Sequence, residues 1–197
     1  MNRDENKKMI LNAAEEAYTL KKVVAESLAE PLLDLAETIS GVIGAGGKLL
    51  ICGNGGSAAD SCHMAAELIV RLSANRNRQS LPAISLAADM AVMTAAGNDY
   101  GYEQIFARQV QGLGHPGDTL FVISTSGNSA NLIRAVETAR DMKLLTVGLL
   151  GGDGGKLGSL VDRKLVIPHS AVQRIQEEQI FLIHLLVELV EGDLCPK

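Results

Sequence analysis

The 197-residue sequence is poor in aromatic residues and has no excess of positive charge. It contains no Trp, and its 18 Lys and Arg residues are outnumbered by 23 Asp and Glu residues, which gives a net charge of -5. Nucleic-acid-binding proteins present a basic surface and often aromatic side chains on which bases stack. The composition therefore argues against a direct role in binding nucleic acid.

Cysteine and long apolar runs are also scarce. The three cysteines, Cys52, Cys62 and Cys195, are an odd number with no paired spacing, which disfavours a disulfide framework and fits a reducing compartment. No uninterrupted apolar stretch approaches the roughly 20 residues that span a bilayer. Residues 1–8 are charged and lead into a helical pattern, so we expect no export signal. These features predict a cytoplasmic protein without a membrane span.

The apolar residues that are present suffice for one folded domain. Hydrophobic residues make up 47% of the chain and charged residues 21%, which is ordinary for a globular protein and too apolar for a disordered one. A chain of this length suits one domain with a sizeable core. We therefore predict a single domain over residues 1–197.

Residues 1–46 predict two amphipathic N-terminal helices. Apolar residues recur at helical spacing over residues 9–28, and the pattern repeats over residues 32–43. Gly44, Gly46 and Gly47 then end the second helix. We expect these helices to take part in oligomerisation.

Residues 47–197 predict an α/β core. Short apolar runs at residues 48–52, 83–87, 119–123, 144–149 and 164–167 alternate with Gly/Ser loops and helical stretches. Runs that are apolar on both faces are typical of parallel strands covered by helices on both sides. The predicted fold class is α/β, with a doubly wound, flavodoxin-like, five-stranded parallel sheet and two N-terminal helices.

The last helical segment, residues 175–190, is apolar nearly all round. A helix that is apolar on every side must be buried, and the two N-terminal helices carry apolar stripes as well. We therefore expect a homo-oligomer, with one well-packed monomer as the alternative.

Residues 124–129 (STSGNS) lie between a predicted strand and a helix that begins at Ala130. A helix N-terminus has unsatisfied backbone N–H groups and a partial positive charge, and small hydroxyl residues allow a phosphate to approach both. The alternative is an ordinary helix with a serine cap, but four hydroxyls and a glycine in six residues exceed what one cap needs. The segment predicts a phosphate-binding loop.

Residues 53–57 (GNGGS) occupy the same position after an earlier strand. Both loops should therefore lie at the carboxyl ends of strands, where open α/β sheets bind ligands. The spacing also fits a loose dinucleotide fingerprint, but residues 70–77 (VRLSANRN) lack the acidic residue that binds the ribose. Residues 151–156 (GGDGGK) resemble a P-loop only superficially, because Leu150 and Leu157 replace its first Gly and its Ser or Thr. We predict a flexible turn there.

Four polar side chains are candidates for chemistry. His63 and Glu67 lie four residues apart and share one helix face; the pair could be a plain surface hydrogen bond, or it could bind a divalent metal such as zinc. His184 lies in an apolar segment, where a histidine with a satisfied core hydrogen bond is the usual case. Gln176 precedes it by eight residues, or about 12 Å of helix, so the two could bind one ion only if their side chains lean together.

A phosphate loop, a carboxylate and an imidazole together suit aldose-ketose isomerisation. That reaction moves one proton between adjacent carbons and another between oxygens. It needs a base, an acid and a group that polarises the carbonyl, but no redox cofactor.

The same residues resemble a known family. Residues 52–57 (CGNGGS), 63–67 (HMAAE), 97–101 (GNDYG), 124–129 (STSGNS) and 174–177 (RIQE), with His184, occur in the order found in bacterial phosphoheptose isomerases, which are sugar isomerase (SIS) domain proteins. The resemblance covers nearly the whole chain. It implies conversion of sedoheptulose 7-phosphate to D-glycero-D-manno-heptose 7-phosphate through an enediol, the first step toward ADP- or GDP-heptose precursors of lipopolysaccharide or other surface polysaccharide.

The resemblance also implies roles for individual residues. Glu67 and His184 look like the acid/base pair, and one Zn²⁺ per subunit would be held by His63, Glu67, Gln176 and His184. The family is a homotetramer with sites formed between subunits and N-terminal helices in a central bundle. The implied substrate contacts are Asn54, Gly55, Gly56, Ser57, Asn98, Asp99, Ser124, Thr125, Ser126, Ser129 and Gln176.

Two departures from the family pattern bear on how the substrate is oriented. Gln173 stands where such enzymes often have Asp, and residues 178–179 (EQ) replace a region where some carry a further His. The alternative function is that of a non-catalytic SIS protein that associates with the replication initiator. Such a protein lacks the residues equivalent to Glu67 and His184, and both are present here.

Overall fold

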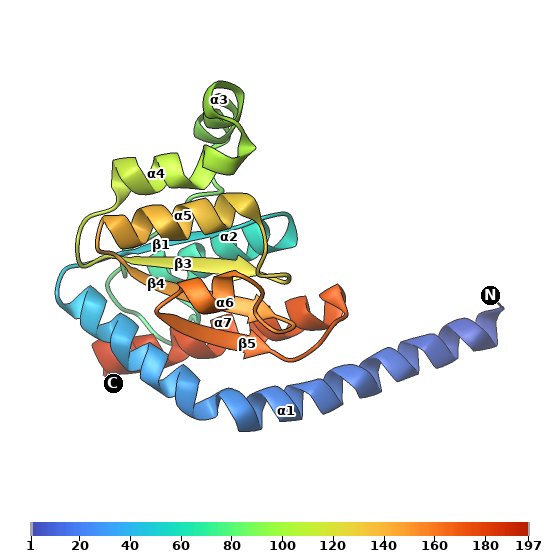
Figure 1. Ribbon diagram of the computed structural model, residues 1–197. Coiled ribbons are helices and arrows are strands. Elements are labelled where there is room, and N and C mark those ends of the chain that lie inside the picture. The colour runs from blue at the N-terminus through green and yellow to red at the C-terminus, as the bar shows by residue number, and fades with distance from the viewer. Residues whose placement is uncertain (1, 197) are drawn as a thin grey trace.

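A five-stranded sheet with helices on both faces forms the body of the molecule (Figure 1). The computed structural model describes residues 2–196; of the predicted domain 1–197, Met1 and Lys197 lie outside the described residues. The strands are β1 (Leu49–Gly53), β2 (Ala83–Ser85), β3 (Thr119–Ser124), β4 (Leu145–Gly151) and β5 (Arg163–Ile167). The helices are α1 (Arg3–Gly44), α2 (Gly56–Ile69), α3 (Met90–Tyr100), the 3-10 helix η1 (Tyr102–Gln104), α4 (Ile105–Leu113), α5 (Ala130–Asp141), α6 (Leu157–Leu160) and α7 (Val172–Leu194).

The strands are all parallel and lie in the order β2-β1-β3-β4-β5. This is the flavodoxin-like order, so the predicted fold class and the five predicted strands are confirmed. The order reverses at β1, which pairs with β2 on one side and β3 on the other. Crossovers that leave in opposite directions open a crevice at the carboxyl ends of these strands. The loops after β1 and β3 meet there.

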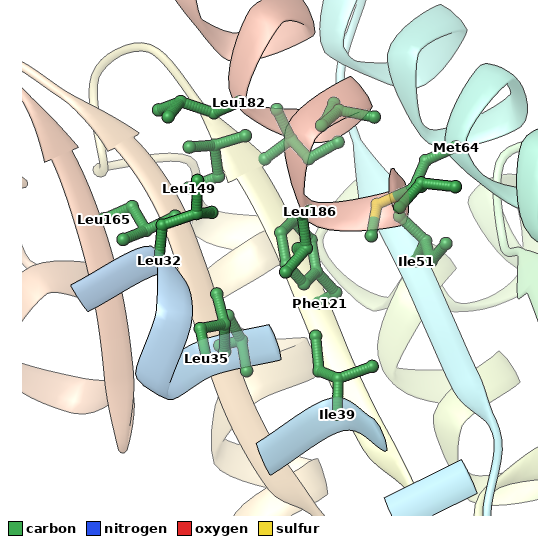
Figure 2. Close-up of a cluster of buried hydrophobic side chains, with 14 of the residues drawn as sticks. Leu32, Leu35, Ile39, Ile51, Met64, Phe121, Leu149, Leu165, Leu182 and Leu186 are labelled. Atoms are coloured by element: carbon green, nitrogen blue, oxygen red, sulfur yellow. The ribbon is translucent and has the colours of Figure 1, made fainter. Parts of the chain in front are cut away.

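Alternate residues of each strand face different helical layers. Leu49 and Ile51 of β1 pack with α1, α2 and α7, whereas Leu50 and Cys52 pack with α4 and α5. Figure 2 shows the first of these clusters, in which Leu32 and Leu35 of α1 lie beside Leu149 and Leu165 of the sheet. The inner strands β1, β3 and β4 are buried on both faces, so their sequences are almost continuously apolar, whereas the edge strands β2 and β5 are partly exposed.

The prediction of two N-terminal helices was wrong, because α1 is one helix of 42 residues with Pro31 inside it. Proline removes one backbone hydrogen bond and clashes with the preceding turn, so it usually ends or bends a helix. Here α1 changes direction near its middle (Figure 1) but continues. Pro31 is exposed, whereas Leu32 and Leu35 beyond it are buried in the core. Packing on the far side of the proline therefore holds the helix together.

The two ends of α1 differ in their surroundings. The second half packs on α7 and β5, with Val24 and Ile39 fully buried. The first half extends past the body of the protein (Figure 1) and exposes Met9, Ile10 and Leu11. Among residues 2–196, no helix has the length and apolar character required to cross a membrane.

Candidate active site

The loop after β3 ends at a helix N-terminus that no side chain caps. Ser129 is the N-cap residue of α5, and its hydroxyl makes no capping hydrogen bond. The N-terminus of α2, after the GNGGS loop, has no side-chain cap either, as is also true of α4, α6 and α7, whereas Asn2 caps α1 and Asp89 caps α3 with side-chain oxygens. An uncapped N-terminus leaves its N–H groups and its partial positive charge available to an anion. This geometry suits the predicted phosphate loop.

The loops after β1 and β3 enclose one small cavity of about 60 Å³. Ile123 and Leu132 form its apolar floor. Six of the predicted substrate residues line it, namely Asn54, Ser57, Ser124, Thr125, Ser126 and Ser129. Hydroxyl, amide and backbone groups therefore converge at the carboxyl ends of two neighbouring strands, as the sequence predicted.

The turn after β4 supports the phosphate loop from behind. Gly127 has φ +64°, and a Cβ there would lie 2.0 Å from the carbonyl oxygen of Gly154. The N–H of Leu157 donates to the Gly127 carbonyl (2.9 Å), and the N–H of Lys156 donates to Asn128 Oδ1 (3.1 Å). Residues 151–156 are therefore a hydrogen-bonded turn packed against the STSGNS loop, and not a nucleotide-binding P-loop.

Two residues that the sequence analysis missed fix the side chain of Asn54. Asn131, which is buried, donates to Asn54 Oδ1 (2.8 Å) and accepts from Asn54 Nδ2 (2.9 Å). The hydroxyl of Tyr102 also donates to Asn54 Oδ1 (3.1 Å). Since a carbonyl oxygen has two lone pairs and one N–H already donates to Asn131, the side chain of Asn54 can offer a ligand only its one remaining N–H.

The candidate acid/base residues lie together on α2 and α7. His63 Nε2 lies 3.0 Å from Glu67 Oε1, and the rings of His63 and His184 meet edge to face with centroids 5.1 Å apart. His63 thus contacts both Glu67 and His184. The side chain of His63 is 43% exposed and that of Glu67 is 19% exposed. The cluster is open to a ligand.

Asp60 lies one helical turn before His63 on α2. Burial raises the pKa of the Asp60 carboxyl above its ordinary value, and the charge of His63 only partly offsets this effect. This carboxyl therefore keeps its proton to a higher pH than an exposed Asp. The sequence analysis did not single it out.

Gln176, on α7, lies against the first turn of α2, whereas Glu67 lies near the end of α2. The Gln176 side chain packs on Gly56, where a Cβ would approach Gln176 Nε2 to 2.6 Å, so a larger residue at this position would displace the Gln176 amide. Gln176 therefore contacts the GNGGS loop. His184 lies about 12 Å further along α7.

The donor set of the predicted zinc site suits that metal in part. Two imidazoles and a carboxylate are typical zinc ligands, and His63, Glu67 and His184 are neighbours. Within residues 2–196, however, no three His, Cys, Asp or Glu side chains gather as a metal site. The hydrogen bond between His63 and Glu67 holds two of the donors against each other.

Asn98 and Asp99 lie apart from the cavity of the two loops. Both are exposed on α3, where Asn98 Nδ2 donates to Asp99 Oδ1 (2.8 Å). Asp99 lines a separate cavity of about 630 Å³ beneath α3 and α4. In this single chain the structure does not bring these two predicted substrate residues to the STSGNS loop. From this region Tyr102 contacts the GNGGS loop, through Asn54.

The two departures from the family pattern have different surroundings. Gln179 is fully buried and donates from Nε2 to the carbonyl of Leu149 in β4 (3.1 Å). It therefore anchors α7 to the sheet and faces away from His184. Gln173 is exposed on the first turn of α7 and lines an open groove against α1.

The geometry of the site defines a class of protein. A flavodoxin-like sheet, an uncapped helix N-terminus over a small polar cavity, and an adjacent imidazole and carboxylate pair characterise an α/β protein that binds a small anionic ligand beside acid/base groups.

Comparison with known proteins narrows the class. The family described as SIS domain matches residues 14–151. A phosphoheptose isomerase from Methylibium petroleiphilum is 47% identical over 178 residues, which cover 89% of this chain and 88% of the relative. The chain belongs to the SIS domain family and, within it, to the phosphoheptose isomerases.

Solved structures agree with this assignment. A phosphoheptose isomerase from Francisella tularensis has a TM-score of 0.91 at 35% identity, covering 95% of this chain and 98% of that one. The enzyme from Neisseria gonorrhoeae has a TM-score of 0.88 at 39% identity, covering 94% and 98%. Nothing in these comparisons favours the alternative of a non-catalytic protein that binds a replication initiator.

Proposed function

We propose that this chain isomerises sedoheptulose 7-phosphate to D-glycero-D-manno-heptose 7-phosphate. One observation carries the proposal: His63 contacts both Glu67 on its own helix, α2, and His184 on α7, so a carboxylate and two imidazoles meet on a helix whose first turn, at Ser57, lines the small polar cavity. Relatives named phosphoheptose isomerase, 47% identical over most of the chain, support the same reaction.

The phosphate and the reacting carbons would occupy different ends of α2. The phosphate binds at the N-terminus of α5, among the hydroxyls of Ser124, Ser126 and Ser129. Asn54 donates one hydrogen bond there from its remaining side-chain N–H, because Asn131 and Tyr102 occupy its oxygen and Asn131 accepts from its other N–H. His63 follows Ser57 by six residues, or about 9 Å along the helix, a span that an extended seven-carbon sugar phosphate covers.

Glu67 and His184 then divide the proton transfers. Glu67 removes a proton from C1 of the ketose while His184 delivers one to the C2 oxygen, which gives the enediol. Glu67 returns a proton to C2 and His184 takes one from the C1 oxygen, which gives the aldose. His63 orients Glu67 through the 3.0 Å hydrogen bond, leaving the second carboxylate oxygen for the substrate.

We further propose that His63, Glu67 and His184, with Gln176, hold one Zn²⁺ per subunit. The chemistry of these donors supports the proposal, and it requires Glu67 and Gln176 to turn toward the two imidazoles. Bound zinc would polarise the carbonyl oxygen of the substrate.

We expect purified protein to carry about one zinc per chain and to lose it to a chelator. Metal content by mass spectrometry and the melting temperature with and without chelator measure this independently of turnover. A chain without zinc, whose melting temperature and activity are unchanged by chelator, would contradict the metal site.

The expected assembly is a homotetramer joined through α1, working in the cytoplasm at the first step of heptose precursor synthesis for surface polysaccharide. The exposed apolar side chains at the start of α1, including Ile10 (63%) and Leu11 (61%), support the assembly. The family resemblance supports its place in metabolism.

The direct test is to incubate the protein with sedoheptulose 7-phosphate and to follow the aldose by NMR. We expect an aldose signal to appear and to reach equilibrium. Absence of the aldose, with and without added zinc, would overturn the proposed function.

A further inference from the structure

A buried guanidinium joins the two helices that carry the acid/base residues. The side chain of Arg78, in the segment between α2 and β2, is 1% exposed, and that of Glu191 on α7 is 2% exposed. Arg78 Nε donates to Glu191 Oε1 (2.7 Å), and Nη2 lies 2.6 Å from the same oxygen. Removing one partner of a buried ion pair strongly destabilises the fold, because the other charge stays buried without a partner.

The other N–H groups of Arg78 bind the C-terminal end of α2. Nη2 donates to the carbonyl of Glu67 and Nη1 to the carbonyl of Leu68, each at 2.8 Å, and Nη1 also donates to the carbonyl of Gln79 (2.9 Å). The N–H of Leu72 donates to Glu191 Oε1 (3.2 Å). One planar side chain therefore ties the backbone of Glu67 itself to α7.

The contacts between α2 and α7 occur in parallel register. Gly56 meets Gln176 near the start of α2, and His63 meets His184 further along. The Arg78–Glu191 clamp comes next, at the end of α2. Glu191 follows His184 by seven residues, or two turns, so both lie on the same face of α7. The clamp is thus the contact that follows the acid/base cluster.

We propose that Arg78 and Glu191 are positioning residues for the isomerisation: they set the spacing of α2 and α7 so that Glu67 and His184 reach the same substrate carbons. This inference rests on the proposed function. Arginine is required because its fork of five N–H donors serves a carboxylate and three carbonyls together, which a lysine ammonium cannot do. The phosphate loop shares none of these contacts.

The test measures kcat and KM separately for variants of the two residues. Because a misplacement of about 1 Å can cost about 100-fold in rate, we expect Arg78→Met and Arg78→Lys to lower kcat per folded molecule at least about tenfold. KM for the sugar phosphate should stay within about twofold, because the STSGNS loop is untouched. Glu191→Gln keeps an acceptor oxygen and should retain more kcat than Glu191→Leu.

The matched control is a second ion pair away from the site. Lys48 Nζ lies 2.5 Å from Asp118 Oδ2 where β1 and β3 begin, at the edge of the sheet opposite the loops. Lys48→Met should lower the urea midpoint of unfolding but leave kcat per folded molecule unchanged, which separates positioning from general stability. Urea titration gives the folded fraction of each variant.

Several outcomes would overturn the clamp. Unchanged kcat per folded molecule in Arg78→Met would do so, as would an equal loss in Lys48→Met. If Arg78→Met does not fold, the comparison of Arg78→Lys, Glu191→Gln and Glu191→Leu decides, and equal kcat values in all three contradict the proposal. A wild-type protein without turnover overturns the proposed function and the clamp together, whereas an active wild type with fully active variants overturns the clamp alone.

Discussion

Glu67 is the residue on which the proposed chemistry depends most directly. Its carboxylate contacts His63, its backbone carbonyl is held by Arg78, and its side chain is only partly exposed. A carboxylate in this position can accept a proton from carbon, whereas an amide of the same shape cannot. General acid/base groups typically contribute about 10²- to 10⁴-fold to a rate.

We therefore predict that Glu67→Gln lowers kcat by about 10²- to 10⁴-fold with the fold intact. Turnover is followed by NMR and folding by circular dichroism. Glu188→Gln is the matched control, because Glu188 lies exposed on α7 and should keep wild-type turnover. Near-normal activity in Glu67→Gln would remove this residue from the mechanism.

Single residues of the site were predictable where their signal is local. The STSGNS and GNGGS loops could be found because each follows an apolar run and precedes a helix. Asn131, Tyr102 and Arg78 gave no such signal, because their partners lie 77, 48 and 113 residues away in the chain. Their function depends on side-chain pairs that form only in the folded protein.

At the scale of elements, burial pattern was a better guide than helix breakers. The five strands were predicted from runs that are apolar on both faces, and the structure confirms them. The two helices predicted from the apolar patterns of residues 9–28 and 32–43 are one helix, α1, which continues through Pro31 although proline removes a helix hydrogen bond and usually ends or bends a helix. Packing of Leu32 and Leu35 on the core outweighs that cost in α1.

The start of the central strands holds a charged contact with a predictable pH dependence. Burial alone would raise the pKa of Asp118. The hydrogen bond from the Lys48 side chain, with backbone N–H groups of His115 and Lys48 and the Lys48 charge, outweighs burial and leaves that pKa below its ordinary value. A carboxyl with a lowered pKa stabilises the fold above its unfolded-state pKa, about 3.9.

The stabilisation by Asp118 is accordingly lost as the pH falls below about 4. We predict that Asp118→Asn lowers the free energy of unfolding at pH 7 and weakens its decline between pH 5 and pH 2. Urea unfolding across this range measures both. An unchanged pH profile in the variant would show that other carboxylates account for the acid sensitivity.

At the scale of the whole molecule, α1 is longer than the surface that a single chain offers for packing it. Forty-two residues at 1.5 Å each span about 63 Å, and the first half projects beyond the core (Figure 1). An isolated helical segment gains little stability without packing of its apolar face. Met9, Ile10, Leu11 and Tyr18, each more than half exposed, are where another copy of the chain would supply that packing.

We predict that Ile10→Glu with Leu11→Glu dissociates the proposed homotetramer, of about four times 20.8 kDa, into smaller species, because the charges would be buried without partners. Light scattering coupled to gel filtration measures the mass, and Asn12→Glu, an exposed polar neighbour, is the control that should stay tetrameric. If sites form between subunits, turnover should fall together with the mass. A monomer with full turnover would show that the acid/base cluster of one chain suffices, and a wild-type monomer would leave the exposed face of α1 without its proposed role.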